Sequence, residues 1–246
     1  MFQAKARAEI LKEVVNVVST LVDEAKFMVN ADGLTLRAVD PAHIAMVELT
    51  LGKDAFEEFS ADETEIGIDI DKLNQFLKLA RSDDIVHLKH DEDKRRLNIV
   101  VGDITRRMSL IDTTGMSDPK VPSLNLPARV VVKGDDLVHG IKASESVSDH
   151  IALIASPDSF EMSCEGDMDQ VNWKKAKKDL AELESAGSVR SLFPLEYFSN
   201  MLRSVSSGNS VTLHLGNDYP VRMEFKIAGG KGDVRYLLAP RIESGD

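Results

Sequence analysis

This 246-residue chain has only one cysteine, no long apolar run and no excess of positive charge. A single cysteine, Cys164, excludes a disulfide framework and a cysteine-rich metal site, and it favours a reducing intracellular setting. Charged residues interrupt the first twenty positions, so no signal peptide is expected, and no apolar stretch approaches the length of a membrane span. We therefore expect a soluble intracellular protein without a membrane partner.

Acidic residues outnumber basic residues by 41 to 30, and the formal net charge is −11. Such a balance argues against nucleic-acid binding, because affinity for a polyanion comes mainly from neutralisation of phosphates by lysine and arginine. The position of the charges matters as well as their sum. Residues 53–71 contain eight acids and one base, which is typical of a solvated surface. The rest of the molecule is then closer to neutral.

The chain repeats one pattern of apolar residues at an offset of about 125 residues. Leu34–Ala38 matches Phe160–Cys164, for example, at a shift of 126. In each copy the pattern predicts a short strand, a helix, several strands, a second helix and closing strands. The four helices are expected at residues 7–19, 71–81, 135–145 and 194–205.

Strands with two-residue alternation dominate both copies, and the helices are few. This pattern disfavours crossover βαβ units and indicates an α+β fold, in which a pair of helices packs on one face of antiparallel sheets. We expect two tandem domains, residues 1–115 and 128–246. The connector at 116–127 contains three prolines, which stiffen an extended segment: Pro119, Pro122 and Pro127.

No group of residues in the sequence matches the spacing of a known catalytic or metal-binding motif. His87 and His90 lie beside Asp91, but side chains three apart on a strand point to opposite faces, so a polar cluster is favoured over a metal site. Residues 229–232 are glycine-rich but lack the spacing and the serine or threonine of a phosphate loop. We expect a binding scaffold without a catalytic residue, a metal or a cofactor. The enzyme alternative is a metal-dependent phosphodiesterase that uses His87 and Asp91.

The outer faces of the expected helices carry basic and amide side chains in pairs three or four residues apart, which places each pair on one face. The pairs are Lys12 with Asn16, Lys78 with Arg81, His139 with Lys142, and Asn200 with Arg203. One such face is ordinary solvated surface. Four of them on a duplicated fold indicate a modestly basic surface.

Several stretches resemble one known family, the DNA sliding clamps of the proliferating cell nuclear antigen type, in their archaeal form. They are LTLRAVDPAHIAMVELTL at Leu34–Leu51, the SDHIALIA opening of Ser148–Gly166, YPVRMEFKI at Tyr219–Ile227 and YLLAPRIES at Tyr236–Ser244. The resemblance runs essentially from end to end. It implies two copies of the DNA-clamp (processivity-fold) domain, with sheets outside and helices inside a pseudo-sixfold homotrimeric ring.

The resemblance also implies which residues act. DNA threads the ring as a sequence-independent duplex, and the residues that would face it are Lys12, Lys78, Arg81, His139, Lys142 and Arg203. Partners dock a short peptide in an apolar pocket, for which the matching positions are Val39, His43, Ile44, Leu124, Leu126, Pro127, Pro220, Leu237, Ala239 and Pro240. The expected partners are the clamp loader, DNA polymerase, flap endonuclease and DNA ligase, in replication and repair.

Subunit contacts are implied between the strand near Thr105–Asp112 of one chain and that near Val171–Lys178 of the next. The basic stretch Lys174–Lys178 departs from the family pattern, and its lysines either weaken the ring or pair with acids across it. A subunit of a heterotrimeric clamp, of the checkpoint or paralogous type, is the alternative to a homotrimer. The expected location is the cytoplasm, at the nucleoid, for an archaeal host, and the nucleus for a eukaryotic one.

Overall fold

The computed structural model describes residues 1–116 and 118–242. These residues form two compact units. Unit 1 comprises Met1–Lys120 and Lys226–Val234, and unit 2 comprises Val121–Phe225 and the described residues from Arg235 onward. Within these described ranges, no helix is long and apolar enough to span a bilayer.

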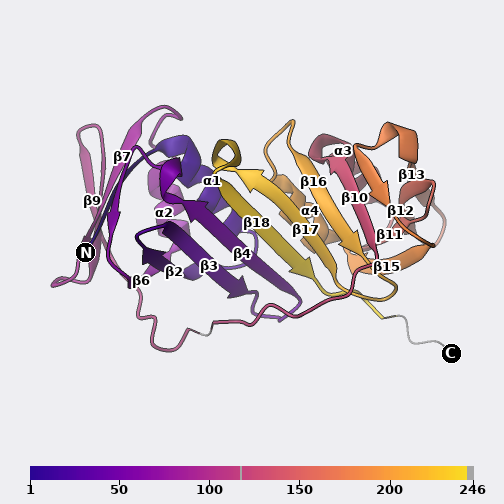
Figure 1. Ribbon diagram of the computed structural model, residues 1–246, viewed down its shortest axis with the longest axis horizontal. Helices are drawn as coiled ribbons and strands as arrows, with labels where there is room; N and C mark the ends of the chain where they lie inside the picture. Colours follow the sequence, from indigo (N-terminus) through magenta and orange to yellow (C-terminus); the bar gives the residue numbers. More distant parts are fainter. Residues whose placement is uncertain (117, 243–246) are drawn as a thin grey trace. The chain divides into compact units, whose positions relative to one another are not determined.

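Unit 1 contains two rows of strands and two helices (Figure 1). Its elements are β1 (Phe2–Arg7), α1 (Ala8–Val18), β2 (Glu24–Asn30), β3 (Gly33–Val39), β4 (Ala45–Gly52), η1 (Lys53–Ala55), β5 (Glu58–Ala61), β6 (Thr64–Asp69), α2 (Ile70–Leu77), β7 (Ile85–Asp91), β8 (Arg96–Val101) and β9 (Ile104–Ser109). One sheet has the order β5-β1-β7-β8-β9, and the second row has the order β4-β3-β2-β6. Their pairings are antiparallel.

Unit 2 repeats this arrangement, with one sheet in the order β13-β12-β11-β15 and a second row in the order β14-β10-β16-β17. Its elements are β10 (Ala128–Lys133), α3 (Gly134–Ser144), β11 (His150–Ala155), β12 (Ser159–Glu165), β13 (Gln170–Ala176), η2 (Lys177–Asp179), β14 (Glu182–Glu184), β15 (Val189–Pro194), α4 (Leu195–Arg203), β16 (Ser210–Leu215) and β17 (Val221–Ile227). η3 (Ala228–Gly230) and β18 (Gly232–Leu238) complete the chain's elements, and β18 has residues in both units. The predicted α+β class with antiparallel sheets is confirmed.

The helices form where the sequence alternates at helical spacing. In α1, Leu11, Val14 and Val18 are buried, so one apolar stripe packs inward while Glu9 occupies the first turn. Helix α2 begins at Ile70 because the Asp69 carboxylate accepts the N–H of Lys72 at 2.8 Å. The side-chain hydrogen bond from Lys72 also holds the pKa of Asp69 below its usual value.

One expectation about these elements was wrong, because helix α2 was predicted to reach residue 81 but ends at Leu77. The acidic stretch 53–71 is the solvated surface that was expected, and it also contains η1, β5 and β6. Its acids are largely exposed, while Ile66 and Ile68 alternate with them and are buried, so the charge obscured a two-residue pattern.

Candidate DNA-facing and docking surfaces

The first helix pair presents three of the predicted DNA-facing cations. Helices α1 and α2 pack against each other in unit 1. The Lys12 ammonium reaches from α1 and donates to the Ala80 carbonyl oxygen at 2.6 Å. Lys12 is half-buried by this contact, whereas Lys78 and Arg81 are exposed. The three cations are therefore held around the chain that follows α2.

Lys78 and Arg81 lie beyond the helix that was expected to carry them. The N–H of Lys78 still donates to the Asn74 carbonyl oxygen, so Lys78 caps the helix at its C-terminus. A cation is favoured there because the carbonyl end of a helix carries partial negative charge. The N–H of Arg81 donates to the Asp84 carboxylate at 2.8 Å rather than to a helical carbonyl oxygen.

The second helix pair is less basic. In unit 2, α3 and α4 pack together, and His139 and Lys142 are exposed on α3. Arg203 ends α4, where one guanidinium nitrogen lies 3.6 Å from the Glu145 carboxylate. This ion pair offsets part of the Arg203 charge. The helix pairs thus present a few exposed cations, and among the described residues Lys78 and Arg81 of unit 1 form no ion pair.

A buried carboxylate organises the first group of docking positions, the loop after β3. Asp40 is only 3% exposed, and it accepts N–H groups from Ala42 at 3.0 Å, Ile44 at 2.7 Å and Ala45 at 2.6 Å. His43 takes a positive φ of 58° between them. Val39 and Ile44 are half-buried and His43 is exposed. The sequence pattern had not singled out Asp40, although it sets the backbone on which His43 and Ile44 are displayed.

The second group of docking positions belongs to unit 2. Leu124 and Leu126 are half-buried on the connector, whose described residues contain no helix or strand. Gly216 packs closely against this segment, because a Cβ added there would lie 3.5 Å from Leu126 and 3.3 Å from the Cβ of Tyr219. Tyr219 is 50% exposed, and it is not among the predicted docking positions. Leu126 and Tyr219 therefore lie beside the same backbone.

The remaining docking positions follow one another toward the C-terminus. Pro220 precedes β17, Leu237 is buried in β18, and Ala239 and Pro240 are half-buried after it. The next residue, Arg241, fixes this segment, because its N–H donates to the Leu192 carbonyl oxygen at 2.7 Å. The segment thus forms an isolated antiparallel β-bridge with β15, between Arg241 and Leu192.

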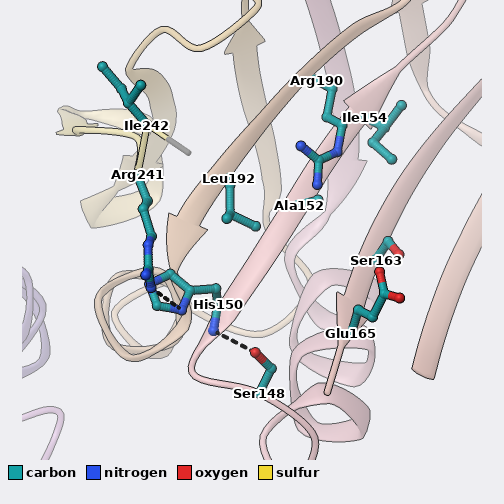
Figure 2. Close-up of a pocket in the computed structure, with 10 residues that line it drawn as sticks. All are labelled: Ser148, His150, Ala152, Ile154, Ser163, Glu165, Arg190, Leu192, Arg241 and Ile242. Atoms are coloured by element: carbon teal, nitrogen blue, oxygen red, sulfur yellow. Dashed lines mark hydrogen bonds between the residues drawn. The ribbon is translucent and has the colours of Figure 1, made fainter. Parts of the chain in front are cut away.

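Figure 2 shows how the Arg241 side chain continues this attachment. Its guanidinium lies against the His150 ring, with one nitrogen 2.7 Å from Nε2. The ring's Nδ1 contacts the Asp149 carboxylate. These residues border a hollow of about 660 Å³, which is lined in part by residues of β11, β12 and β15. Its lining is Ser148, His150, Ala152, Ile154, Ser163, Glu165, Arg190, Leu192, Arg241 and Ile242.

Comparison with known proteins decides the family. The N-terminal domain of proliferating cell nuclear antigen matches residues 1–115, and its C-terminal domain matches residues 120–241. The chain belongs to the proliferating cell nuclear antigen family. A relative from Methanosarcina mazei, named DNA polymerase sliding clamp, is 44% identical over 99% of this chain and all of its own. A relative of the same name from Methanococcoides burtonii is 42% identical over the same shares.

Solved structures agree with this assignment. The structure titled "C-terminal region of FEN-1 bound to A. fulgidus PCNA" has a TM-score of 0.94 and 34% identity, and it covers all of both chains. The proliferating cell nuclear antigen of Thermococcus kodakaraensis has a TM-score of 0.91 at 28% identity, over 98% of this chain and all of its own. The predicted sliding-clamp family, with a scaffold rather than an enzymatic role, is confirmed.

The enzyme alternative had depended on His87 and Asp91. In the clamp these residues lie on β7, where His87 is exposed and His90 is half-buried. Among residues 1–116 and 118–242, no group of three or more histidine, cysteine or acidic side chains is placed to hold a metal ion. The family assignment leaves the phosphodiesterase interpretation without support.

Proposed function

We propose that three copies of this chain close into a ring that encircles duplex DNA and tethers replication and repair proteins to it. The observation that carries this proposal is the similarity to archaeal DNA polymerase sliding clamps, which spans both domains at 44% identity. In such a ring the two clamp domains are residues 1–115 and 128–246, joined by 116–127. The protein would then work at the archaeal nucleoid.

In this ring the DNA is contacted by basic side chains on the two helix pairs and on the segment that follows α2. They are Lys12, Lys78, Arg81, His139, Lys142 and Arg203. A sliding ring needs weak, uniform phosphate contacts, because each strong contact would have to break before the ring could move along the duplex. The helix pairs suit this role, since Lys12 is tied to a carbonyl oxygen and Arg203 is partly neutralised by Glu145.

Retention on circular DNA tests the ring. The protein is loaded on a nicked plasmid with a clamp loader and ATP, and the complex is separated by gel filtration. A ring held by topology stays on the circle and leaves when a restriction enzyme linearises it. Equal retention on linear and circular DNA would contradict encirclement. Light scattering gives the mass in parallel, and a monomer that assembles only with paralogues would indicate a heterotrimeric clamp.

The double variant Lys78→Glu/Arg81→Glu tests the DNA-facing assignment. Both side chains are exposed, so the fold should persist, while retention at low salt should fall by about tenfold or more, because cations become anions near phosphates. The matched control is Lys53→Glu/Lys89→Glu, which makes the same change of charge on exposed residues outside α1 and α2. Unchanged retention of the first variant would contradict the assignment.

A short docking peptide is the second proposed ligand. The similar structure titled with the FEN-1 C-terminal region motivates this choice, and flap endonuclease, DNA ligase, DNA polymerase and the clamp loader would dock in the same way. The docking positions are Val39, His43, Ile44, Leu124, Leu126, Pro127, Pro220, Leu237, Ala239 and Pro240.

The variant Leu124→Ser/Leu126→Ser tests the docking assignment. We expect it to abolish binding of a fluorescent peptide from a flap endonuclease C-terminus, with trimer formation unchanged, because half-buried leucines on a connector offer apolar surface to a ligand. Ser123→Ala/Asn125→Ala, which alters the exposed neighbours, is the control. Anisotropy titration gives the affinities, and equal affinity for the leucine variant and the wild type would contradict the assignment.

A further inference from the structure

The face of β10, β16 and β17 that points away from the core of unit 2 carries a row of basic side chains. Leu213 and Met223 are buried on the core side, so their neighbours His214 and Arg222 lie on the opposite face. His214 is paired with Arg222 on one side and with Arg129 of β10 on the other. The row therefore crosses three adjacent strands, which can be followed in Figure 1.

The carboxylate of Glu224, on the same face of β17, is shared among several donors. Its Oε2 atom lies 3.1 Å from His214 Nε2, and its Oε1 atom accepts the Arg235 Nε–H at 2.9 Å. Arg222 Nε lies 3.3 Å from the same Oε1 atom, but it is buried and has no hydrogen-bond partner among the described residues. Glu224 therefore leaves Arg222 as the donor that it does not satisfy.

Other cations of this face have an acidic side chain of their own. Arg129 pairs with the Glu182 carboxylate, and Lys226 pairs with the Asp233 carboxylate. Within the described chain, Arg222 has only the carboxylate that Arg235 already engages, and its guanidinium forms no hydrogen bond. About a third of the Arg222 side chain remains exposed, so its terminal nitrogens can be reached by a ligand.

Arg222 lies next to proposed docking positions of unit 2. Pro220 precedes it by two residues and shares its face of the strand, because side chains alternate along β17. Leu237 bears the same relation to Arg235 on β18. Two residues of a strand span only about 7 Å. A peptide that contacts Pro220 and Leu237 therefore passes within reach of the Arg222 guanidinium.

We infer that Arg222 binds a carboxylate side chain, from aspartate or glutamate, of the peptide that docks on these apolar positions. The inference rests on the proposed docking of a peptide and adds a charge preference to it. A carboxylate can accept two parallel N–H bonds from one guanidinium, and Arg222 has the donors to form them. His214 and Arg235 hold the Glu224 carboxylate, which limits its competition with the carboxylate of the ligand.

Paired peptides test this charge preference. Each pair is a fluorescent flap endonuclease C-terminal peptide that carries either glutamate or glutamine at one position, and that position is moved along the peptide. Anisotropy titration gives the affinities for the wild type and for Arg222→Gln. At one or two adjacent positions the glutamate peptide should bind the wild type about three- to fivefold more tightly than its glutamine partner, as expected for a partly exposed ion pair. The ratio should fall to about one in Arg222→Gln.

Two more variants make the test specific to this site. Arg222→Lys keeps the charge and should retain part of the preference, although an ammonium cannot form the two parallel bonds. Glu224→Gln removes the competing carboxylate and should raise the ratio above that of the wild type. The control is Lys133→Gln, which removes an exposed cation at the far end of β10 and should leave the ratio unchanged.

The glutamine peptides report whether docking itself is intact, and they should bind the wild type and Arg222→Gln equally. If Arg222→Gln is misfolded, the ratio in Glu224→Gln decides, and no increase there would overturn the inference. Equal affinity of both peptides for the wild type at every position, or an unchanged ratio in Arg222→Gln, would show that the inference is wrong while docking stands. If no peptide binds the wild type, both proposals fail. A loss of trimers or of DNA retention in Arg222→Gln, with the ratio unchanged, would assign the site to a second copy or to DNA instead.

Discussion

Glu224 is the centre of a charged cluster on unit 2 whose contribution to stability should depend on pH. Its carboxylate on β17 lies 3.1 Å from His214 Nε2, 2.9 Å from Arg235 Nε and 3.3 Å from Arg222 Nε. The hydrogen bond with His214, with smaller contributions from Arg235 and Arg222, lowers the pKa of Glu224 from 4.5 to about 2. The ionised form is therefore favoured in the folded protein.

The size of the effect follows from this change. The difference between the ordinary pKa and the pKa in the folded protein corresponds to at most about 3.4 kcal/mol of stabilising free energy. Glu224 keeps 30% of its side-chain surface exposed, and solvent screening reduces the figure to about 1–2 kcal/mol. Because the folded pKa is the lower one, the stabilisation is fully present above about pH 4.5. It is lost as the pH falls from there to about 2.

Glu224→Gln should lower the free energy of unfolding by about 1–2 kcal/mol at pH 7, and the difference from the wild type should vanish near pH 2. Urea titrations at fixed protein concentration, followed by circular dichroism from pH 7 to pH 2, measure both. The control is Glu184→Gln, an exposed glutamate without an ion pair in the described chain, which should change stability by less than about 0.5 kcal/mol. A deficit for Glu224→Gln that stays constant down to pH 2 would refute the electrostatic reasoning.

Two further changes test close packing and the docking loop. In α3, a Cβ on Gly140 would collide with Met162 and lie 3.1 Å from Trp173 Cγ. Gly140→Ala should therefore destabilise the protein in thermal melts, because overpacking costs about 1–3 kcal/mol and exceeds the gain of about 1 kcal/mol in helix propensity. Gly187→Ala, where an added Cβ meets nothing within 4 Å, is the control, and an equal or higher melting temperature for Gly140→Ala would contradict the packing argument. Asp40→Ala removes the acceptor of three N–H groups and should cost about 2–4 kcal/mol in urea titrations while weakening peptide binding. The stability and the peptide affinity of Asp40→Asn should lie between those of the wild type and those of Asp40→Ala. If Asp40→Ala binds the peptide with wild-type affinity, the loop does not need the Asp40 carboxylate for docking.

Much of the architecture could be predicted because its signals are local. Alternation at Leu34–Ala38 and its match at Phe160–Cys164 predicted strands that form β3 and β12. Helical spacing of Leu11, Val14 and Val18 predicted the buried face of α1. Such periods depend only on neighbouring residues, so they can be read without knowing the partner surface. The docking and DNA-facing assignments came instead from resemblance to a family, and they remain proposals.

What the sequence determined by itself is the duplicated pattern of strands and helices, since burial of one face of each element follows from residue spacing. Only the tertiary structure decided where charges are neutralised and where elements end. Lys175 contacts Asp136, which lies 39 residues away in the chain. Helix α2 ends at Leu77, and Arg81 lies beyond it with its N–H donated to the Asp84 carboxylate. Contacts between distant residues depend on how the elements pack, and residue spacing does not encode them.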